Sequence, residues 1–153
     1  MTNKLTPELL MKLEQDLNKK KFVNVKTRTG EIIEIEMYEN LRDTLIERAY
    51  LNFTAMLAEL EQRTIIDDEL LVGACKCYPF FLVKEIANLP NVPTDPSIEQ
   101  AIALSRLLTD LHIIKGILDS LSKEDKKLIE KSNNAMQKEI GKQLGELFIK
   151  SRL

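Results

Sequence analysis

One histidine and two cysteines are the side chains best suited to chemistry in this sequence. His112 is the only histidine among 153 residues, so any Ser-His-Asp or Cys-His triad would have to include it. It follows Leu111 within a helical pattern and has no nucleophile motif nearby. Catalytic groups more often occupy loops on a rigid scaffold. We therefore expect His112 to be a surface or boundary residue of a helix.

The two cysteines, Cys75 and Cys77, are separated by a single lysine. A closed zinc site needs four ligands, usually from two such pairs, and the chain has no further cysteine. The spacing also differs from the Cys-x-x-Cys pattern of redox proteins. We expect two buried structural thiols and neither a metal ion nor a cofactor. A zinc site shared between molecules and oxidation of the thiols are the alternatives.

Carboxylates are concentrated around the second of two predicted strands, at Glu31, Glu34, Glu36 and Glu39. Paired carboxylates can perform acid–base catalysis when burial separates their pKa values. Charges on an exposed strand also prevent aggregation between strand edges, and we favour this role. Since the chain has no phosphate-binding glycine loop, dinucleotide fingerprint, HExxH motif or EF-hand loop, we expect a protein that is not an enzyme.

Basic residues cluster around the first predicted strand. The members of this basic cluster are Lys19, Lys20, Lys21, Lys26 and Arg28. Binding of phosphates needs such a cluster. Proteins that bind single-stranded nucleic acid usually add stacking aromatic residues, and only Phe22 lies nearby. Solvated helix ends are the simpler interpretation, and contact with nucleic acid or with acidic protein partners are the alternatives. A nucleic-acid-associated assembly or packaging factor is the alternative function.

The composition indicates one globular domain. Hydrophobic residues make up 44% of the chain and charged residues 30%, with 22 basic against 24 acidic side chains. These values exclude a disordered polyelectrolyte and a histone-like basic protein. Only five glycines and five prolines argue against an all-β fold. We expect a single domain over 1–153, with an N-terminal helix and hairpin over 1–38 and a helical body over 39–153 that contains a proline-rich connection at 90–96.

Alternating hydrophobic residues predict one β-hairpin near residues 22–37. A three-residue loop ending at Gly30 gives the best register and places a glycine where this loop needs a left-handed backbone. Val25 then pairs with Ile33, and Val23 with Ile35, on one face. An isolated hairpin is only marginally stable, so this apolar face should pack on the helices or pair with a strand of another chain.

Helical spacing covers most of the remaining sequence and predicts a mainly α domain with five or six helices. The first is capped by Thr6 and Pro7 and ends near Asn18. The second is expected to begin at Asn40 as its N-cap. Pro79 should kink or split the apolar run at 69–89, because proline breaks the helical hydrogen-bond ladder.

The predicted helix after the proline-rich connection carries a heptad seam. Its members include Leu104, Leu107, Leu111, Ile114 and Leu118. The seam covers about two and a half repeats, fewer than the three to four that indicate a true coiled coil. Isoleucines off the seam give this helix a second apolar face, which a single chain of this size is not expected to cover completely.

Together these features predict a non-enzymatic interaction or assembly protein that self-associates. The apolar face of the hairpin and the heptad seam are the two expected interfaces, and the expected partner is a protein, with a homo-oligomer favoured. In its short length, helical hairpins and lack of a catalytic motif, the layout resembles that of small phage assembly factors such as tail-assembly chaperones, connectors and packaging subunits.

The sequence favours a cytoplasmic location, or a virion-associated one if the chain is phage-encoded. Two cysteines are too few for a disulfide framework, and the start of the chain has no uninterrupted apolar segment typical of a secretory signal. The most apolar stretch, 70–89, contains charged residues that a membrane-spanning helix would avoid. We therefore expect no membrane association.

Overall fold

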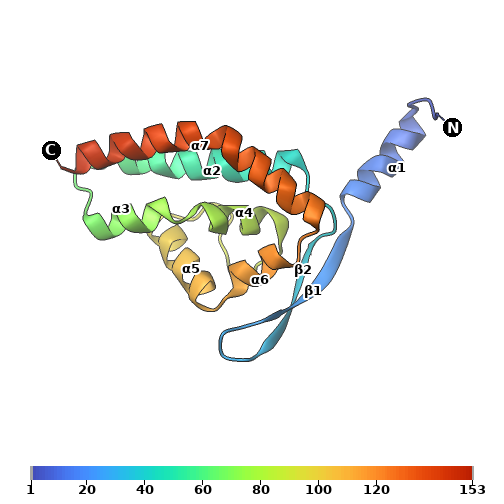
Figure 1. The fold of residues 1–153 in the computed structure, drawn as a ribbon, viewed down its shortest axis with the longest axis horizontal. Helices are drawn as coiled ribbons and strands as arrows, with labels where there is room; N and C mark the ends of the chain where they lie inside the picture. The colour runs from blue at the N-terminus through green and yellow to red at the C-terminus, as the bar shows by residue number, and fades with distance from the viewer. Residues whose placement is uncertain (1, 153) are drawn as a thin grey trace.

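The computed structural model describes residues 2–152, which contain seven helices and a two-stranded antiparallel sheet (Figure 1). The elements are, in chain order, α1 (Pro7–Leu17), β1 (Lys20–Lys26), β2 (Ile32–Tyr38), α2 (Asp43–Glu61), α3 (Asp68–Cys75), α4 (Tyr78–Ile86), α5 (Ile98–Asp110), α6 (Ile113–Asp119) and α7 (Lys123–Ser151). The prediction of a mainly α fold with one hairpin is confirmed, although the helices are more numerous than the expected five or six.

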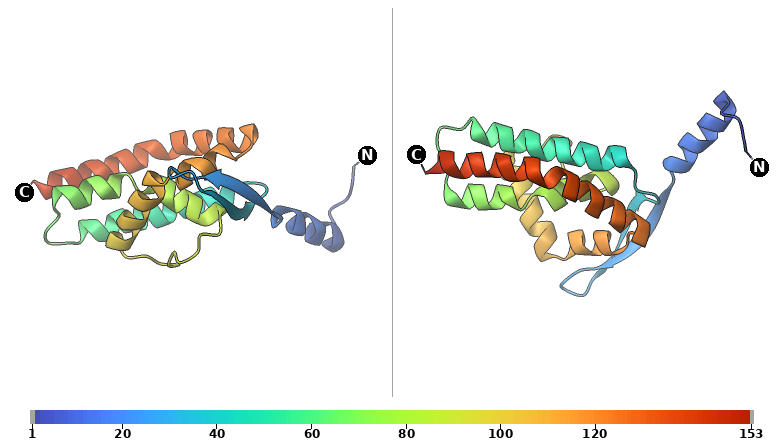
Figure 2. Two further views of the ribbon diagram at one scale, coloured as in Figure 1. Left: turned by 90° about the horizontal axis from the view of Figure 1, so that it is seen from below. Right: turned by 45° about the horizontal axis from the view of Figure 1, so that its top comes forward.

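The helices form layers around one apolar core. The two longest helices, α2 and α7, lie side by side, and α4 packs under α2 (Figures 1 and 2). The shorter α5 and α6 lie on the other side of α3 and α4. Fully buried side chains come from all of these helices, among them Phe53, Leu57, Leu60, Leu71, Phe80, Val83, Ile98, Ile117 and Leu147.

The hairpin forms in the predicted register. Val25 pairs with Ile33, Val23 with Ile35, and Asn24 with Glu34 on the opposite face. The backbone of Gly30 has φ = 92°, so the loop uses glycine where a left-handed residue is needed. β1 begins slightly earlier than expected, at Lys20.

The apolar face of the hairpin packs on the helices of the same chain. α6 lies against β1 at Gly116, which comes so close that a methyl group there would overlap the side chain of Val25. The amide of Arg28 donates to the carbonyl of Leu111 over 3.0 Å. The amide of Asn88 donates to the carbonyl of Glu36 over 2.8 Å. The hairpin is therefore fastened to the helical body at both ends.

The predicted long helix that carries the heptad seam is wrong, because the chain turns at its middle. α5 ends at Asp110, α6 begins at Ile113, and His112 between them has φ = 63°, in the left-handed region. A non-glycine residue pays about 1–2 kcal/mol for this conformation. The turn redirects α6 onto the hairpin, where burial of Ile113, Ile114 and Ile117 offsets that cost.

Helix ends follow the sequence at most positions. The hydroxyl of Thr6 accepts from the amide of Leu9, and that of Ser122 accepts from Asp125, as good N-caps do. α3 and α4 are separated at Lys76 and Cys77, so the split near Pro79 is confirmed. The Asn40 cap is wrong, since α2 begins at Asp43. The preceding segment is instead held by the amide of Leu41, which donates to Asp125 at the start of α7.

Two exposed glycines in α7 lead to a stability prediction. A methyl group added at Gly141 or at Gly145 would meet nothing within 4 Å. Because glycine costs about 1 kcal/mol relative to alanine in a helix interior, Gly141→Ala should raise the free energy of unfolding by about that amount. Urea denaturation monitored by circular dichroism measures the change. A destabilised variant would mean that α7 is not a regular helix at this point.

Candidate interaction site

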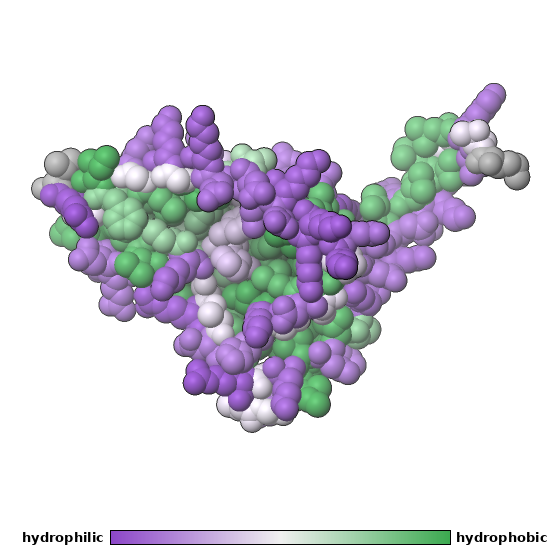
Figure 3. All heavy atoms as spheres, in the orientation of Figure 1, coloured by the Kyte–Doolittle hydropathy of each residue, from purple (hydrophilic) through white to green (hydrophobic). Residues whose placement is uncertain are grey.

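α1 is an amphipathic helix whose apolar face lies against nothing in the described chain. None of its eleven residues is buried. Leu9, Leu10, Leu13 and Leu17 share one face at helical spacing, and Leu10 is 55% exposed and Leu13 46%. The helix projects from the end of the hairpin, clear of the helical body (Figure 2), and hydrophobic residues lie on its surface beside hydrophilic ones (Figure 3). An apolar stripe of this kind normally faces a core.

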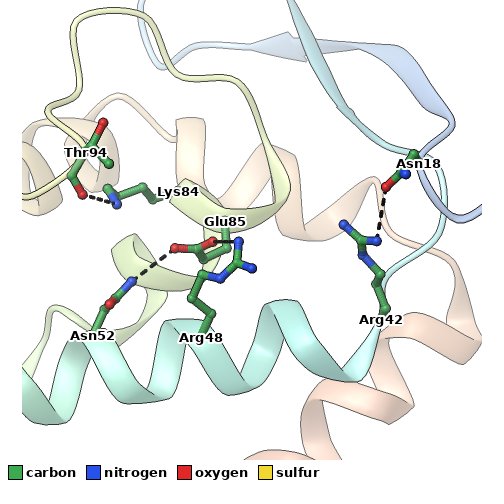
Figure 4. A network of polar contacts seen from close by, with 7 residues as sticks. All are labelled: Asn18, Arg42, Arg48, Asn52, Lys84, Glu85 and Thr94. Carbon is green, nitrogen blue, oxygen red and sulfur yellow. Dashed lines mark hydrogen bonds and ion pairs between the residues drawn. The ribbon is translucent and has the colours of Figure 1, made fainter. Parts of the chain in front are cut away.

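The junction between α1 and the hairpin is held in place. The guanidinium of Arg42 donates to the Asn18 side-chain oxygen over 3.1 Å (Figure 4) and lies 5.0 Å from the ring centroid of Tyr38. The amide of Glu39 donates to the carbonyl of Lys19 over 2.9 Å. These contacts tie the residues that join α1 to β1 to the end of the hairpin and the start of α2.

Acidic side chains border the apolar face of α1. At 100° per residue, Asp16 lies on one side of the leucines and Glu14 on the other. The helix carries Glu8, Glu14 and Asp16 against Lys12, a net charge of −2. Helices that lie on membrane surfaces instead carry many basic residues on the polar face. The charges of α1 therefore favour a protein surface over a lipid surface.

An apolar groove of about 550 Å³ lies between α3 and the α5–α6 corner. Its apolar lining includes Val72, which is 45% exposed, together with Pro79, Ile114 and Leu118. Ile114 and Leu118 are two of the residues predicted for an interface. Basic side chains stand on both walls, Lys76 beside α3 and Arg106 and Lys115 on α5 and α6, together with Asp110 and Asp119.

The other predicted interface residues are largely covered by this chain. Val25 and Ile35 of the hairpin are buried, and Val23 and Ile33 are half-buried against the core. Of the three seam leucines on or just after α5, Leu104 and Leu111 are half-buried and Leu107 is 54% exposed. The two sets are not joined into one surface, because the turn at His112 places α5 and α6 in different directions.

The basic cluster does not converge on one point. Lys19 pairs with Asp16 over 3.4 Å and Lys20 with Glu36 over 3.7 Å, so two of its charges already face carboxylates. Lys21 lies on the opposite face of β1 from Lys20, as alternation along a strand requires. Lys26 and Arg28 are exposed near the tip of the hairpin.

A second, polar cavity of about 550 Å³ lies beside the proline-rich connection. The Glu85 side chain is only 10% exposed, and it accepts from Arg48 over 3.4 Å and from Asn52 over 3.1 Å (Figure 4). The neighbouring Lys84 donates to the carbonyl of Thr94 over 2.8 Å. Both oxygens of Glu85 are thus used in fastening α2 to α4, and Lys84 fastens the connection.

The two cysteines are held as neutral thiols. Cys77 is buried and donates to the carbonyl of Gly73 over 3.3 Å, and Cys75 is half-buried. Burial raises the pKa of Cys75, and it raises the pKa of Cys77 from 9.0 to about 11. Within residues 2–152, no group of three or more histidine, cysteine or acidic side chains is placed to hold a metal ion.

Burial of the thiols gives a prediction for labelling and for pH. Because thiolate is the reactive form, iodoacetamide at neutral pH should label Cys77 much more slowly in the folded protein than in urea. The unfolded thiol loses its proton near pH 9 and the folded one near pH 11. The free energy of unfolding should therefore decrease as the pH rises from about 9 to about 11. Mass spectrometry after timed labelling measures the alkylation rate of Cys77, and equal rates in the folded and unfolded protein would contradict burial of its thiol.

The sequence predicts α1 as a helix, but it does not identify its apolar face as an interaction site. The leucine spacing and the Thr6 cap predict α1 correctly, yet nothing in the spacing says that the helix leaves the body.

No helix in the described part of the chain is both long enough and apolar enough to cross a lipid bilayer.

Comparison with protein-family models, with curated proteins and with solved structures finds no match to this chain. Its function therefore has to be inferred from its own residues.

Proposed function

We propose that this protein is a non-enzymatic interaction protein that self-associates through α1. The observation that carries the proposal is the uncovered apolar face of α1, formed by Leu9, Leu10, Leu13 and Leu17 and held away from the body by the Asn18 junction. Exposed apolar surface of this kind marks a place where another surface binds.

The length of α1 supports the same proposal. Isolated helices shorter than about 12–15 residues are only marginally stable in water, and most helical stability comes from packing of the apolar face. α1 has eleven residues and no buried side chain. A partner surface would supply the packing that the described chain does not.

The expected strength of association follows from the leucines. Full burial of one leucine contributes about 1.5–3 kcal/mol, so covering half-exposed leucines on two exchanged helices contributes on the order of 6–12 kcal/mol. Loss of translational and rotational freedom costs about 4–15 kcal/mol. We therefore expect an assembly that dissociates on dilution.

The test compares masses in solution. Size-exclusion chromatography with light scattering should give the wild type a mass that is a multiple of 17.6 kDa at high micromolar concentration. The variant Leu10→Asp/Leu13→Asp should have the mass of one chain, because aspartate on this face opposes burial. Leu51→Asp changes an equally exposed leucine on α2 and should leave the mass unchanged. A wild type that is monomeric at every concentration would refute self-association.

The same chromatography also tests the alternative function in nucleic-acid binding. Lys26 and Arg28, exposed near the hairpin tip, are the observation that keeps it open. Co-purifying nucleic acid that is released at high salt would favour it, since phosphate contacts weaken steeply with salt. An assembly factor of the kind whose layout this chain resembles needs self-association or a protein partner, and we favour that role.

A further inference from the structure

We propose that the apolar face of α1 from one copy docks into the groove between α3 and the α5–α6 corner of a second copy. This inference rests on the proposed self-association and names the surface that receives α1. The groove has an apolar lining that includes Val72, Ile114 and Leu118. It can therefore receive leucine side chains, which water surrounds on the free helix.

The position of α1 makes a second copy the occupant. Asn18 and Lys19, which join α1 to β1, are held by Arg42 and Glu39. From this fixed base α1 points away from the helical body, whereas the groove lies on the body beside α3, α5 and α6 (Figures 1 and 2). In this arrangement α1 lies away from the groove of its own chain (Figures 1 and 2), so the α1 that we place in the groove comes from another copy.

The two surfaces carry individual side chains of opposite charge beside their apolar parts. Glu14 and Asp16 flank the apolar face of α1 on both sides, and the helix has a net charge of −2. Lys76 stands on one wall of the groove and Lys115 on the other. Arg106 is already paired with Glu69 over 3.3 Å, so Lys76 and Lys115 are the cations that remain for a docked helix, beside Asp110 and Asp119. Opposite charges beside an apolar contact fix its orientation and exclude wrong partners.

The contact joins two different surfaces, so it can generate a closed ring or an open filament. We propose the smallest closed form, in which two copies exchange their helices around a two-fold axis. Each copy then donates one α1 and offers one groove. This arrangement makes the two halves of the contact separable by mutation, which the following experiment uses.

The groove is tested by Val72→Glu in the full-length protein. Val72 is 45% exposed, so a glutamate is tolerated by the fold while it places a negative charge against the acidic helix. Light scattering should show the loss of the oligomer. Leu51→Glu, at an exposed apolar position on α2 outside the groove, is the matched control and should assemble as the wild type does.

Mixing the two monomeric variants at high concentration adds a complementation test. Leu10→Asp/Leu13→Asp keeps an intact groove, and Val72→Glu keeps an intact α1. The mixture should form a one-to-one heterodimer that neither variant forms alone, held by one contact instead of two and therefore weaker than the wild type. If Val72→Glu still assembles as the wild type does, the groove is not the receptor for α1.

The charge pairing is tested by reversal. Lys76→Glu/Lys115→Glu should weaken assembly, more so at low salt, and adding Glu14→Lys/Asp16→Lys to the same chain should restore it. Failure of the combined variant to recover would overturn the proposed orientation. If the α1 variant loses assembly and the groove variants keep it, docking into this groove is refuted, whereas self-association through α1 stands. A monomeric wild type would refute the proposed function itself.

Discussion

Replacing Phe53 by alanine is expected to lower the free energy of unfolding by about 3–5 kcal/mol. Phe53 is 1% exposed at the centre of the α2–α4 contact. Its ring lies 5.7 Å from that of Tyr78 in an edge-on arrangement and 6.1 Å from that of Phe81. Alanine would remove both contacts and leave a cavity between α2 and α4.

The measurement is urea denaturation of the two proteins at two protein concentrations, so that dissociation and unfolding are separated. Leu51→Ala, two residues away on the exposed face of α2, should change the free energy of unfolding by less than about 0.5 kcal/mol. A loss below about 1 kcal/mol for Phe53→Ala would mean that α2 and α4 do not pack through this residue.

Gly116→Ala is expected to destabilise the protein by about 1–3 kcal/mol, because it overpacks the contact between α6 and the hairpin. The added methyl group would overlap Val25, which is 2% exposed. Although alanine favours the helix, the clash is the larger effect. Hydrogen exchange should show the hairpin amides losing protection first, since β1 is the element that must move.

Gly141→Ala is the matched comparison for Gly116→Ala. The chemical change is the same and both glycines are helical, but Gly141 has open space around it. The two variants should therefore change the free energy of unfolding in opposite directions. Two stabilised variants would show that α6 does not approach β1 as closely as described.

Local rules carried much of the fold prediction. The register of the hairpin follows from two short alternating runs and one glycine, all within the 19 residues from Lys20 to Tyr38. The Thr6 and Ser122 caps follow from hydrogen bonds between neighbours three residues apart. Such features depend on little beyond the adjacent chain, so the sequence alone is sufficient to find them.

The turn at His112 could not be predicted in the same way. Leucines continue at helical spacing through this point, and no glycine or proline marks a break. The turn exists because Ile113, Ile114 and Ile117 gain more by packing on a hairpin that lies far away in sequence. Tertiary packing of this kind overrides local propensity.

The candidate site was missed for a related reason. An amphipathic pattern says that one face of α1 needs a cover, but it does not say whether the cover belongs to the same chain. The sequence placed the unsatisfied surface on the hairpin and the heptad seam, whereas the structure packs most of those residues internally and leaves α1 exposed. Two seam residues, Ile114 and Leu118, nevertheless line the groove.

Hydrogen–deuterium exchange of the α1 amides, measured over a range of protein concentrations, tests the central claim most directly. A free helix of eleven residues frays and exchanges quickly, whereas a docked helix is protected. Self-association predicts that protection of α1 rises with concentration and disappears in Leu10→Asp/Leu13→Asp, while the core of α2 stays protected throughout. Rapid exchange of α1 at every concentration, or protection that does not depend on concentration, would contradict self-association through this helix.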